Sequence, residues 1–117
     1  MHEFSLMASV LDIAAEEMGR HGARRLKLLR LRCGELDHAQ PESLHMAFQA
    51  MTAGTASEGA RLELEEEPLL LRCTLCGQDF HPADKNGMFA PCPYCGKGPS
   101  YRVEKGEGIV LEHLEAE

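Results

Sequence analysis

The chain has 117 residues, a formal net charge of −7 and five cysteines. This length is enough for one compact domain, or for a small domain with a second lobe stabilised by a metal ion. No apolar run approaches the roughly 18–20 residues that span a bilayer, and the chain does not begin with the basic segment of a signal peptide. Four of the cysteines form two pairs at ligand spacing and Cys33 stands alone, which suits metal binding in a reducing compartment better than a disulfide framework. We therefore expect a cytoplasmic protein with no membrane partner.

The first part of the chain alternates between helical and strand periodicity. Apolar residues recur at helical spacing over residues 5–19, and glycines at positions 19 and 22 end that segment. Residues 26–33 follow strand periodicity, with leucines and a cysteine alternating with arginines. A second helix is predicted to begin at Pro41, a residue suited to the first helical turn, and to end within residues 52–55. Residues 61–65 alternate again, which predicts a second strand.

Four of the cysteines form two pairs with the same C-x-x-C-G pattern, Cys73/Cys76 and Cys92/Cys95. The glycine after each pair permits the tight turn of a metal-binding knuckle. Four thiolates at roughly 2.3 Å in a tetrahedron are a ligand set that Zn²⁺ prefers, and the closed shell leaves no position for a substrate. We therefore expect a structural zinc ion, whose binding stabilises a lobe too short to bury a core of its own.

After the cysteine pairs, Gly106 and Gly108 predict a hinge before a last strand at residues 109–114. A single strand is not stable alone, so this strand is expected to return to the sheet of the first lobe. The predicted fold class is α+β: two helices on a small mixed β-sheet, with an inserted four-cysteine zinc-ribbon lobe. The predicted domains are a first lobe of residues 1–71, completed by residues 106–117, and a zinc-binding lobe of residues 72–105.

Nucleic-acid binding, a common role of zinc ribbons, is disfavoured by the charge distribution. Such binding needs clustered Lys and Arg to displace counterions from phosphates. Residues 72–105 contain five basic and three acidic residues, a net charge of +2, and have no row of stacking aromatics. The basic residues between positions 24 and 32 are spaced as on the solvated face of a strand. We therefore expect no nucleic-acid partner.

The first three residues, Met1, His2 and Glu3, offer nitrogen ligands for a second metal ion. The Met1 amine, the His2 amide nitrogen and the His2 imidazole can close fused chelate rings around one ion, and the Glu3 amide nitrogen is a further candidate. Nitrogen ligands that include deprotonated amides favour metals of planar geometry, which means Ni²⁺ or Cu²⁺ rather than Zn²⁺. The alternative is that position 2 is occupied by a histidine without any role in metal binding.

Three features together resemble the HypA family, nickel-delivery proteins for the maturation of [NiFe] hydrogenases. They are the Met-His-Glu-Phe-Ser start, the segments Gly34-Glu35-Leu36 and Pro41-Glu42-Ser43-Leu44, and the two cysteine pairs. The resemblance runs in order over nearly the whole chain. It implies an α+β nickel-binding lobe and a separate zinc lobe. It also implies nickel held by the Met1 amine, the His2 and Glu3 backbone nitrogens and the His2 side chain. The cargo would pass to a hydrogenase large-subunit precursor together with a HypB-type GTPase.

The segment before the second helix departs from the family pattern. Some relatives place an acidic residue near the start of this helix, close to the nickel; here the candidates are Asp37, His38 and Glu42.

A last strand tethered through glycines is compatible with either a monomer or a homodimer. A further hypothesis is that acidic surface residues attract the cation or a basic partner. The residues in question are Glu16, Glu17, Glu35 and Glu42.

Three residues are weaker candidates for chemistry. Cys33 falls in the inward register of a strand, which favours a buried small residue over a reactive thiol. His81 follows Cys76 by five residues and either bonds a zinc-bound thiolate or is an ordinary hairpin residue. His113 alternates with apolar neighbours and is expected in the core.

No Gly-rich phosphate loop, activated-serine motif or pair of catalytic carboxylates stands out, so the chain is not expected to be an enzyme. The leading hypothesis is a nickel metallochaperone with Ni²⁺ as cargo and Zn²⁺ as a structural ion. Two alternatives remain open. One is a zinc-ribbon adaptor without nickel function, and the other is a rubredoxin-like iron protein, since rubredoxins share the same cysteine knuckles.

Overall fold

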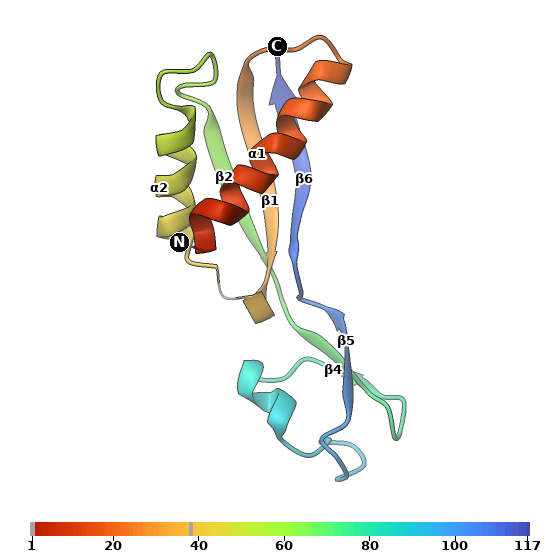
Figure 1. The fold of residues 1–117 in the computed structure, drawn as a ribbon. Coiled ribbons are helices and arrows are strands. Elements are labelled where there is room, and N and C mark those ends of the chain that lie inside the picture. The colour runs from red at the N-terminus through yellow and green to blue at the C-terminus, as the bar shows by residue number, and fades with distance from the viewer. Residues whose placement is uncertain (1, 38) are drawn as a thin grey trace. The chain divides into compact units, whose positions relative to one another are not determined.

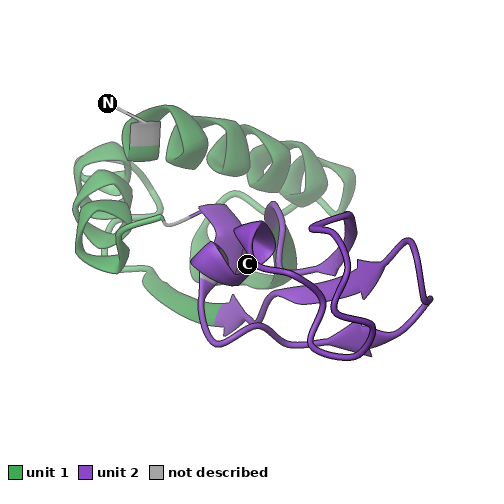
Figure 2. Cartoon of the chain, turned by 90° about the horizontal axis from the view of Figure 1, so that it is seen from below, with its two compact units in different colours: residues 1–32, 39–65, 110–117 green, residues 33–38, 66–109 purple. Residues whose placement is uncertain are grey.

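The computed structural model describes residues 2–37 and 39–117, apart from the side chains of His2 and Lys85. The chain divides into two units. The first comprises residues 1–32, 39–65 and 110–117, and the second comprises residues 33–38 and 66–109 (Figure 2). The domain boundaries expected at residues 71/72 and 105/106 stay a prediction. No helix of the described part is long and apolar enough to cross a membrane.

The first unit begins with helix α1 (His2–Arg20) (Figure 1). The helix starts before the expected residue 5, and Glu3 in its first turn interacts favourably with the positive end of the helix dipole. It ends where Gly22 takes a left-handed conformation with φ of 70°, and the Ala23 N–H bonds the Met18 carbonyl oxygen at 2.9 Å. Its buried face consists of four residues at intervals of three or four: Met7, Val10, Ala14 and Met18.

Three strands form a mixed sheet in the order β2-β1-β6: β1 (Leu26–Gly34), β2 (Arg61–Glu67) and β6 (Ile109–Ala116). β1 and β6 are antiparallel, because backbone hydrogen bonds join Arg25 to Glu117 near one end and Gly34 to Gly108 near the other. β1 and β2 run in the same direction and are connected through a helix (Figure 1). The last strand therefore returns to the sheet of the first strand, as the sequence predicts.

The connecting helix is α2 (Pro41–Thr52), which begins at the expected proline and packs against α1. It closes with a hydrogen bond from the Thr52 hydroxyl to the Phe48 carbonyl oxygen at 2.8 Å. Burying a large apolar side chain stabilises a fold by about 1.5–3 kcal/mol. The core of this unit is formed by large side chains that are at most 2 % exposed: Met7, Leu26, Leu29, Leu31, Leu44 and Phe48.

The second unit contains a separate antiparallel sheet in the order β4-β3-β5: β3 (Leu70–Cys73), β4 (Asp79–Phe80) and β5 (Tyr101–Lys105). It also contains two short 3₁₀ helices, η1 (Glu35–Asp37) and η2 (Lys85–Phe89). The Phe80 ring packs edge-on against Tyr101 and Tyr94, with centroids 5.4 and 6.3 Å apart. These aromatic contacts supply part of the packing in a lobe that has few aliphatic residues.

Gly34, Gly106 and Leu69 form a close backbone crossing inside the second unit. A Cβ at Gly34 would lie 2.3 Å from the Gly106 carbonyl oxygen, and a Cβ at Gly106 would lie 2.5 Å from the Leu69 Cα. The Leu36 N–H bonds the Gly106 carbonyl oxygen at 2.9 Å, and the Gly34 N–H bonds the Gly108 carbonyl oxygen at 2.8 Å. The two glycines expected to form a hinge, Gly106 and Gly108, are therefore held by hydrogen bonds, and the crossing at Gly34 and Gly106 leaves no room for a Cβ.

Candidate metal centre

The four paired cysteines converge on one point in the second unit. Their Sγ atoms all lie within 4.8 Å of one another, and the Cys73–Cys95 and Cys76–Cys92 separations are both 3.8 Å. A disulfide would require an S–S distance of about 2.05 Å, so these are free thiols. Sulfur ligands about 2.3 Å from an ion at the centre of a regular tetrahedron lie about 3.8 Å apart. The donor set and its spacing therefore fit a tetrathiolate zinc ion.

The two cysteine pairs are held by the same backbone hydrogen bonds. In each pair the glycine N–H donates to the carbonyl oxygen of the first cysteine, at 2.8 Å for Gly77 and 2.9 Å for Gly96. The N–H of that cysteine donates to the residue after the glycine, at 3.0 and 2.9 Å. Both glycines have a positive φ, 77° and 72°, a conformation that a Cβ would disfavour. The C-x-x-C-G pattern thus produces two equivalent knuckles, as the sequence predicts.

The strands of the second unit present one side of the cluster to the protein and the other to solvent. Cys73 is the last residue of β3, where it pairs with Tyr101 of β5, and it is fully buried. The first cysteine of the second pair is buried as well, whereas Cys76 is exposed and Cys95 is half-buried. One cysteine of each pair is therefore anchored by the fold, and the other closes the cluster from outside.

The four thiols influence one another's protonation. Burial raises the pKa of Cys92, but the N–H groups of Cys95 and Tyr94 and the neighbouring thiols outweigh this effect and lower the value to about 7. The Gln78 N–H lowers the pKa of Cys76, but burial and the neighbouring thiols prevail and raise it to about 11. A cation that takes all four sulfurs as thiolates must displace protons, so its affinity rises with pH.

Two of the three residues predicted to bind nickel belong to the start of α1. His2 and Glu3 belong to the first turn of this helix, whereas Met1 and the His2 side chain lie outside the described residues. The first four N–H groups of an α-helix have no partner within the helix. The amide nitrogens of His2 and Glu3 are therefore not needed for helical hydrogen bonds, and a metal ion that binds them does not compete with the helix.

The three candidates before and within α2 differ in their surroundings. The Asp37 carboxylate accepts a hydrogen bond from the Gly108 N–H, which holds it within the second unit. Glu42 is exposed in the first turn of α2 and has no hydrogen bond or ion pair among the residues that the structure describes. His38 lies outside the described residues. A part for any of the three in nickel binding stays a prediction.

The structure gives hydrogen-bond partners for two histidines, His81 and His113. The His81 Nδ1 lies 2.8 Å from the Leu69 carbonyl oxygen, so the ring donates to the backbone there. The side chain of His113 is 44 % exposed, and its Nε2 lies 3.0 Å from Glu115. The expectation that His113 belongs to the core is therefore wrong, because β6 is an edge strand and its neighbours do not cover the ring.

Cys33 is half-buried near the end of β1 and is separate from the cysteine cluster. Burial raises the pKa of its thiol, and the negative charges of Asp37 and Glu66 raise it further. A raised pKa lowers the thiolate fraction and hence the reactivity. Its surroundings agree with the expectation of an unreactive residue.

Glu35 has a structural role that the sequence analysis did not identify. Its Oε1 accepts a hydrogen bond from the Leu69 N–H at 2.7 Å. A glutamate in a short segment between a strand and a helix shows no periodicity that would indicate a hydrogen bond to a backbone N–H far along the chain. Only the close approach of the two segments reveals the contact.

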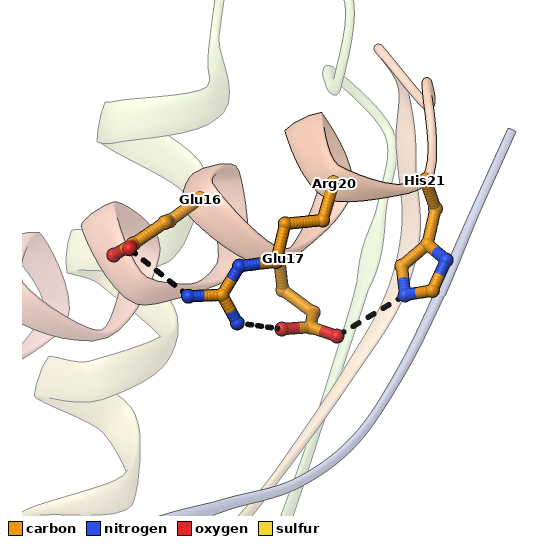
Figure 3. A network of polar contacts seen from close by, with 4 residues as sticks. All are labelled: Glu16, Glu17, Arg20 and His21. Atoms are coloured by element: carbon orange, nitrogen blue, oxygen red, sulfur yellow. Dashed lines mark hydrogen bonds and ion pairs between the residues drawn. The ribbon is translucent and has the colours of Figure 1, made fainter.

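Part of the acidic surface proposed from the sequence is neutralised by ion pairs (Figure 3). The Arg20 guanidinium lies 3.2 Å from both Glu16 and Glu17, and the His21 Nε2 lies 3.2 Å from the other carboxylate oxygen of Glu17. Exposed pairs of this kind stabilise a helix by only about 0.2–1 kcal/mol each. They nevertheless leave less negative charge at this end of α1 to attract a cation, and the hypothesis of attraction stays untested.

The two helices on a mixed sheet and the four-cysteine cluster define a class of small α+β metal-binding proteins. Residues 1–116 match a family model described as "Hydrogenase/urease nickel incorporation, metallochaperone, hypA". The chain therefore belongs to the HypA family of nickel metallochaperones. The resemblance inferred from the start motif and the cysteine pairs is confirmed.

Relatives and solved structures agree with this assignment. A "Hydrogenase maturation factor HypA" from Lawsonia intracellularis is 44% identical over 118 residues, and one from Solidesulfovibrio magneticus is 42% identical over 117 residues. Both matches cover 100% of each chain. The solution structure of the Ni metallochaperone HypA from Helicobacter pylori has a TM-score of 0.69 at 19% identity, covering 97% of this chain and 96% of that chain. At this low identity the structural match supports the fold alone, and it confirms the predicted fold class.

Proposed function

We propose that this chain binds Ni²⁺ at its N-terminus and delivers it during the maturation of a [NiFe] hydrogenase, while a structural Zn²⁺ holds the four-cysteine lobe. The observation that carries the proposal is the family match over residues 1–116, taken together with Met1, His2 and Glu3 at the start of the chain. The protein is a carrier and not an enzyme, since transfer of a bound ion requires ligand exchange and no covalent chemistry.

Four nitrogen atoms form the proposed nickel site: the Met1 amine, the His2 and Glu3 amide nitrogens and one nitrogen of the His2 imidazole. Such a set favours Ni²⁺ over Zn²⁺ because deprotonated amides suit planar coordination. The place of His2 and Glu3 in the first turn of α1 supports the proposal, since their amides have no acceptor within the helix. The Glu3 side chain has no part in the set and only its backbone nitrogen is used.

A site in the first turn of a terminal helix also suits release of the cargo. Helix ends open at a low free-energy cost, whereas the core residues of α1 begin at Met7. An incoming ligand from an acceptor protein can therefore replace the nitrogens one after another without unfolding the unit. The proposed partners are a HypB-type GTPase and the hydrogenase large-subunit precursor.

The zinc ion in this proposal has a purely structural part. Cys73, Cys76, Cys92 and Cys95 would supply four thiolates, and their Sγ spacing fits the ion. The ion supplies folding free energy to a unit whose strands are only two to five residues long. Because all four ligands come from the protein, no coordination position is left for a reactant.

Titration of the untagged, zinc-loaded protein with Ni²⁺ tests the nickel site. His2→Ala should abolish binding of the first nickel ion, whereas Glu3→Ala should retain it because the Glu3 amide nitrogen remains. Glu3→Pro is the sharper variant, since proline removes the amide proton that nickel must displace yet is tolerated in a first helical turn. Nickel binding that is equal in His2→Ala and the unaltered protein would overturn the proposal.

The same preparation distinguishes the two alternatives that the sequence left open. A zinc-ribbon adaptor would bind zinc and show no nickel binding that depends on His2. A rubredoxin-like protein would hold iron at the four cysteines and be red in the ferric state, whereas the zinc form is colourless. Metal analysis of the protein as isolated, combined with its visible spectrum, therefore separates all three functions.

A further inference from the structure

A cavity of about 210 Å³ lies in the first unit. None of its lining residues is a proposed metal ligand. The cavity is lined by the second half of α1, the end of α2, the start of β1 and the turn that follows α2, and it is open to solvent on one side. Most of its lining is apolar and comes from Leu11, Ala14, Ala15, Met18, Leu26 and Met51. A closed apolar cavity of about 150 Å³ is large enough to hold benzene. This cavity therefore has room for one benzene-sized group with a short linker.

One arginine, Arg24, also lines the cavity. Arg24 is exposed and has no side-chain hydrogen bond or ion pair among the residues described by the structure. It therefore stands where the cavity meets solvent. Its basic neighbours along the chain are paired: Arg20 with Glu16 and Glu17 (Figure 3), Arg25 and Lys27 with Glu117, and Arg30 with Glu63.

The hydroxyl groups of the cavity offer one further donor. Ser57 Oγ accepts a hydrogen bond from the Leu26 N–H at 3.0 Å, and its own proton has no acceptor among the described residues. The Thr52 and Thr55 hydroxyls differ, because they donate to the Phe48 and Thr52 carbonyl oxygens at 2.8 and 2.6 Å. The cavity thus combines an apolar interior with a guanidinium and a single free hydroxyl donor. Both of these groups recognise a carboxylate.

We propose that this cavity is a binding site for a carboxylate attached to one benzene-sized apolar group. The apolar group would fill the space between α1 and α2, and the carboxylate would bind the Arg24 guanidinium and the Ser57 hydroxyl. Such a ligand is either a free aromatic or branched-chain acid or the C-terminal residue of a peptide. This site is independent of nickel binding, so its failure and that of the proposed function are separate results.

The test uses the full chain loaded with zinc and probes matched in their apolar group. 3-Phenylpropionate and 3-phenylpropan-1-ol distinguish recognition of the carboxylate from burial of the ring. N-acetyl-Ala-Ala-Phe as a free acid and as an amide represents the end of a peptide. Binding is followed by chemical-shift changes of the backbone amides in a ¹⁵N spectrum. The site predicts shifts at Ala15, Arg24, Met51 and Ser57, and about three- to tenfold tighter binding of each acid than of its neutral counterpart.

Two variants, each with a matched control, locate the site. Arg24→Gln should remove the preference for the acid, whereas Arg25→Gln should not, because Arg25 is paired with Glu117 and does not line the cavity. Ala15→Leu should fill the cavity and abolish binding of both probes, whereas Ala8→Leu should not. Both alanines are exposed on α1 and leucine is a good helix former, so neither change should unfold the chain.

The possible outcomes decide the proposal. Binding of 3-phenylpropionate or of the peptide acid that depends on Arg24 supports the site, and the tighter of the two identifies its source. Equal binding of acid and alcohol, binding unaffected by Ala15→Leu, or shifts outside the lining residues would overturn it. No binding of any probe at millimolar concentration would show that the cavity is a packing defect, and would overturn it as well.

Discussion

The Glu35 carboxylate accepts a hydrogen bond from the Leu69 N–H at 2.7 Å. On the other side of the same residue, His81 donates to the Leu69 carbonyl oxygen at 2.8 Å. Leu69 is 1 % exposed, so water does not replace either partner. Side chains from two separate segments therefore fix the backbone just before β3, the strand that carries Cys73.

Removal of the Glu35 acceptor should destabilise the second unit. Glu35→Ala leaves the buried Leu69 N–H unpaired, at an expected cost of about 1–3 kcal/mol. Glu35→Gln keeps an acceptor oxygen and should cost less. Urea unfolding of the zinc-loaded protein measures the difference. Glu107→Ala is the control, because Glu107 is exposed in the same unit and has no hydrogen bond among the described residues. Equal stability of Glu35→Ala and the control would refute the role of Glu35.

Two glycine substitutions should change stability in opposite directions. Gly34→Ala places a Cβ 2.3 Å from the Gly106 carbonyl oxygen, so the backbone must move and we expect a loss above about 2 kcal/mol. Gly19→Ala meets nothing within 4 Å in the helix α1 and should stabilise by about 0.5–1 kcal/mol. Thermal unfolding of the two variants beside the unaltered protein checks both signs. A loss for Gly19→Ala would contradict the helix as described.

Loss of one cysteine of the cluster should unfold the second unit selectively. Cys73→Ala or Cys95→Ala removes a thiolate ligand, so zinc content should fall and residues within 66–109 should lose their amide protection. The first unit has its own core and should keep α1 folded. Cys33→Ala is the matched control and should retain zinc, since Cys33 is outside the cluster. Unchanged zinc content in Cys73→Ala or Cys95→Ala would refute the tetrathiolate site.

The native thiol of Cys33 should react slowly with iodoacetamide. Its pKa is raised by burial and by the charges of Asp37 and Glu66, so the thiolate fraction at a given pH is smaller than in the unfolded chain. The rate of Cys33 alkylation in the zinc-loaded protein should therefore begin to rise at a higher pH than in the denatured protein. Asp37→Asn removes one negative charge and keeps an acceptor for the Gly108 N–H, and should speed the reaction. Identical pH profiles for the native and denatured protein would contradict the shift.

The elements with strong periodicity could be predicted from the sequence. The helical spacing of apolar residues in α1 and the proline at the start of α2 predicted the two helices, and alternating leucines predicted β1. The return of β6 followed from the fact that an isolated strand is unstable. The cysteine cluster followed from its spacing, because C-x-x-C-G encodes both the ligands and the turn that orients them.

What could not be predicted depends on segments far apart in the sequence. The alternation of His113 with apolar residues indicated a buried position, but the place of β6 at a sheet edge leaves the ring exposed. Gly106 indicated flexibility, whereas its conformation permits a close crossing with Gly34 and Leu69. β4 has only two residues and is too short to show a period. In each case the deciding contact is tertiary, and local pattern carries no signal for it.

The nickel site can be tested most directly through the amino group of Met1. Calorimetric titration with Ni²⁺ should compare the zinc-loaded, untagged protein with the same protein acetylated at its amino group. We expect the protein with a free amine to bind one nickel ion per chain. Acetylation removes a direct ligand, and loss of an outer-shell partner alone weakens metal binding by roughly 10–100-fold, so we expect the nickel affinity to fall by more than that. Zinc content should be equal in both. Nickel binding of the same affinity in both forms would show that the Met1 amine is not a nickel ligand.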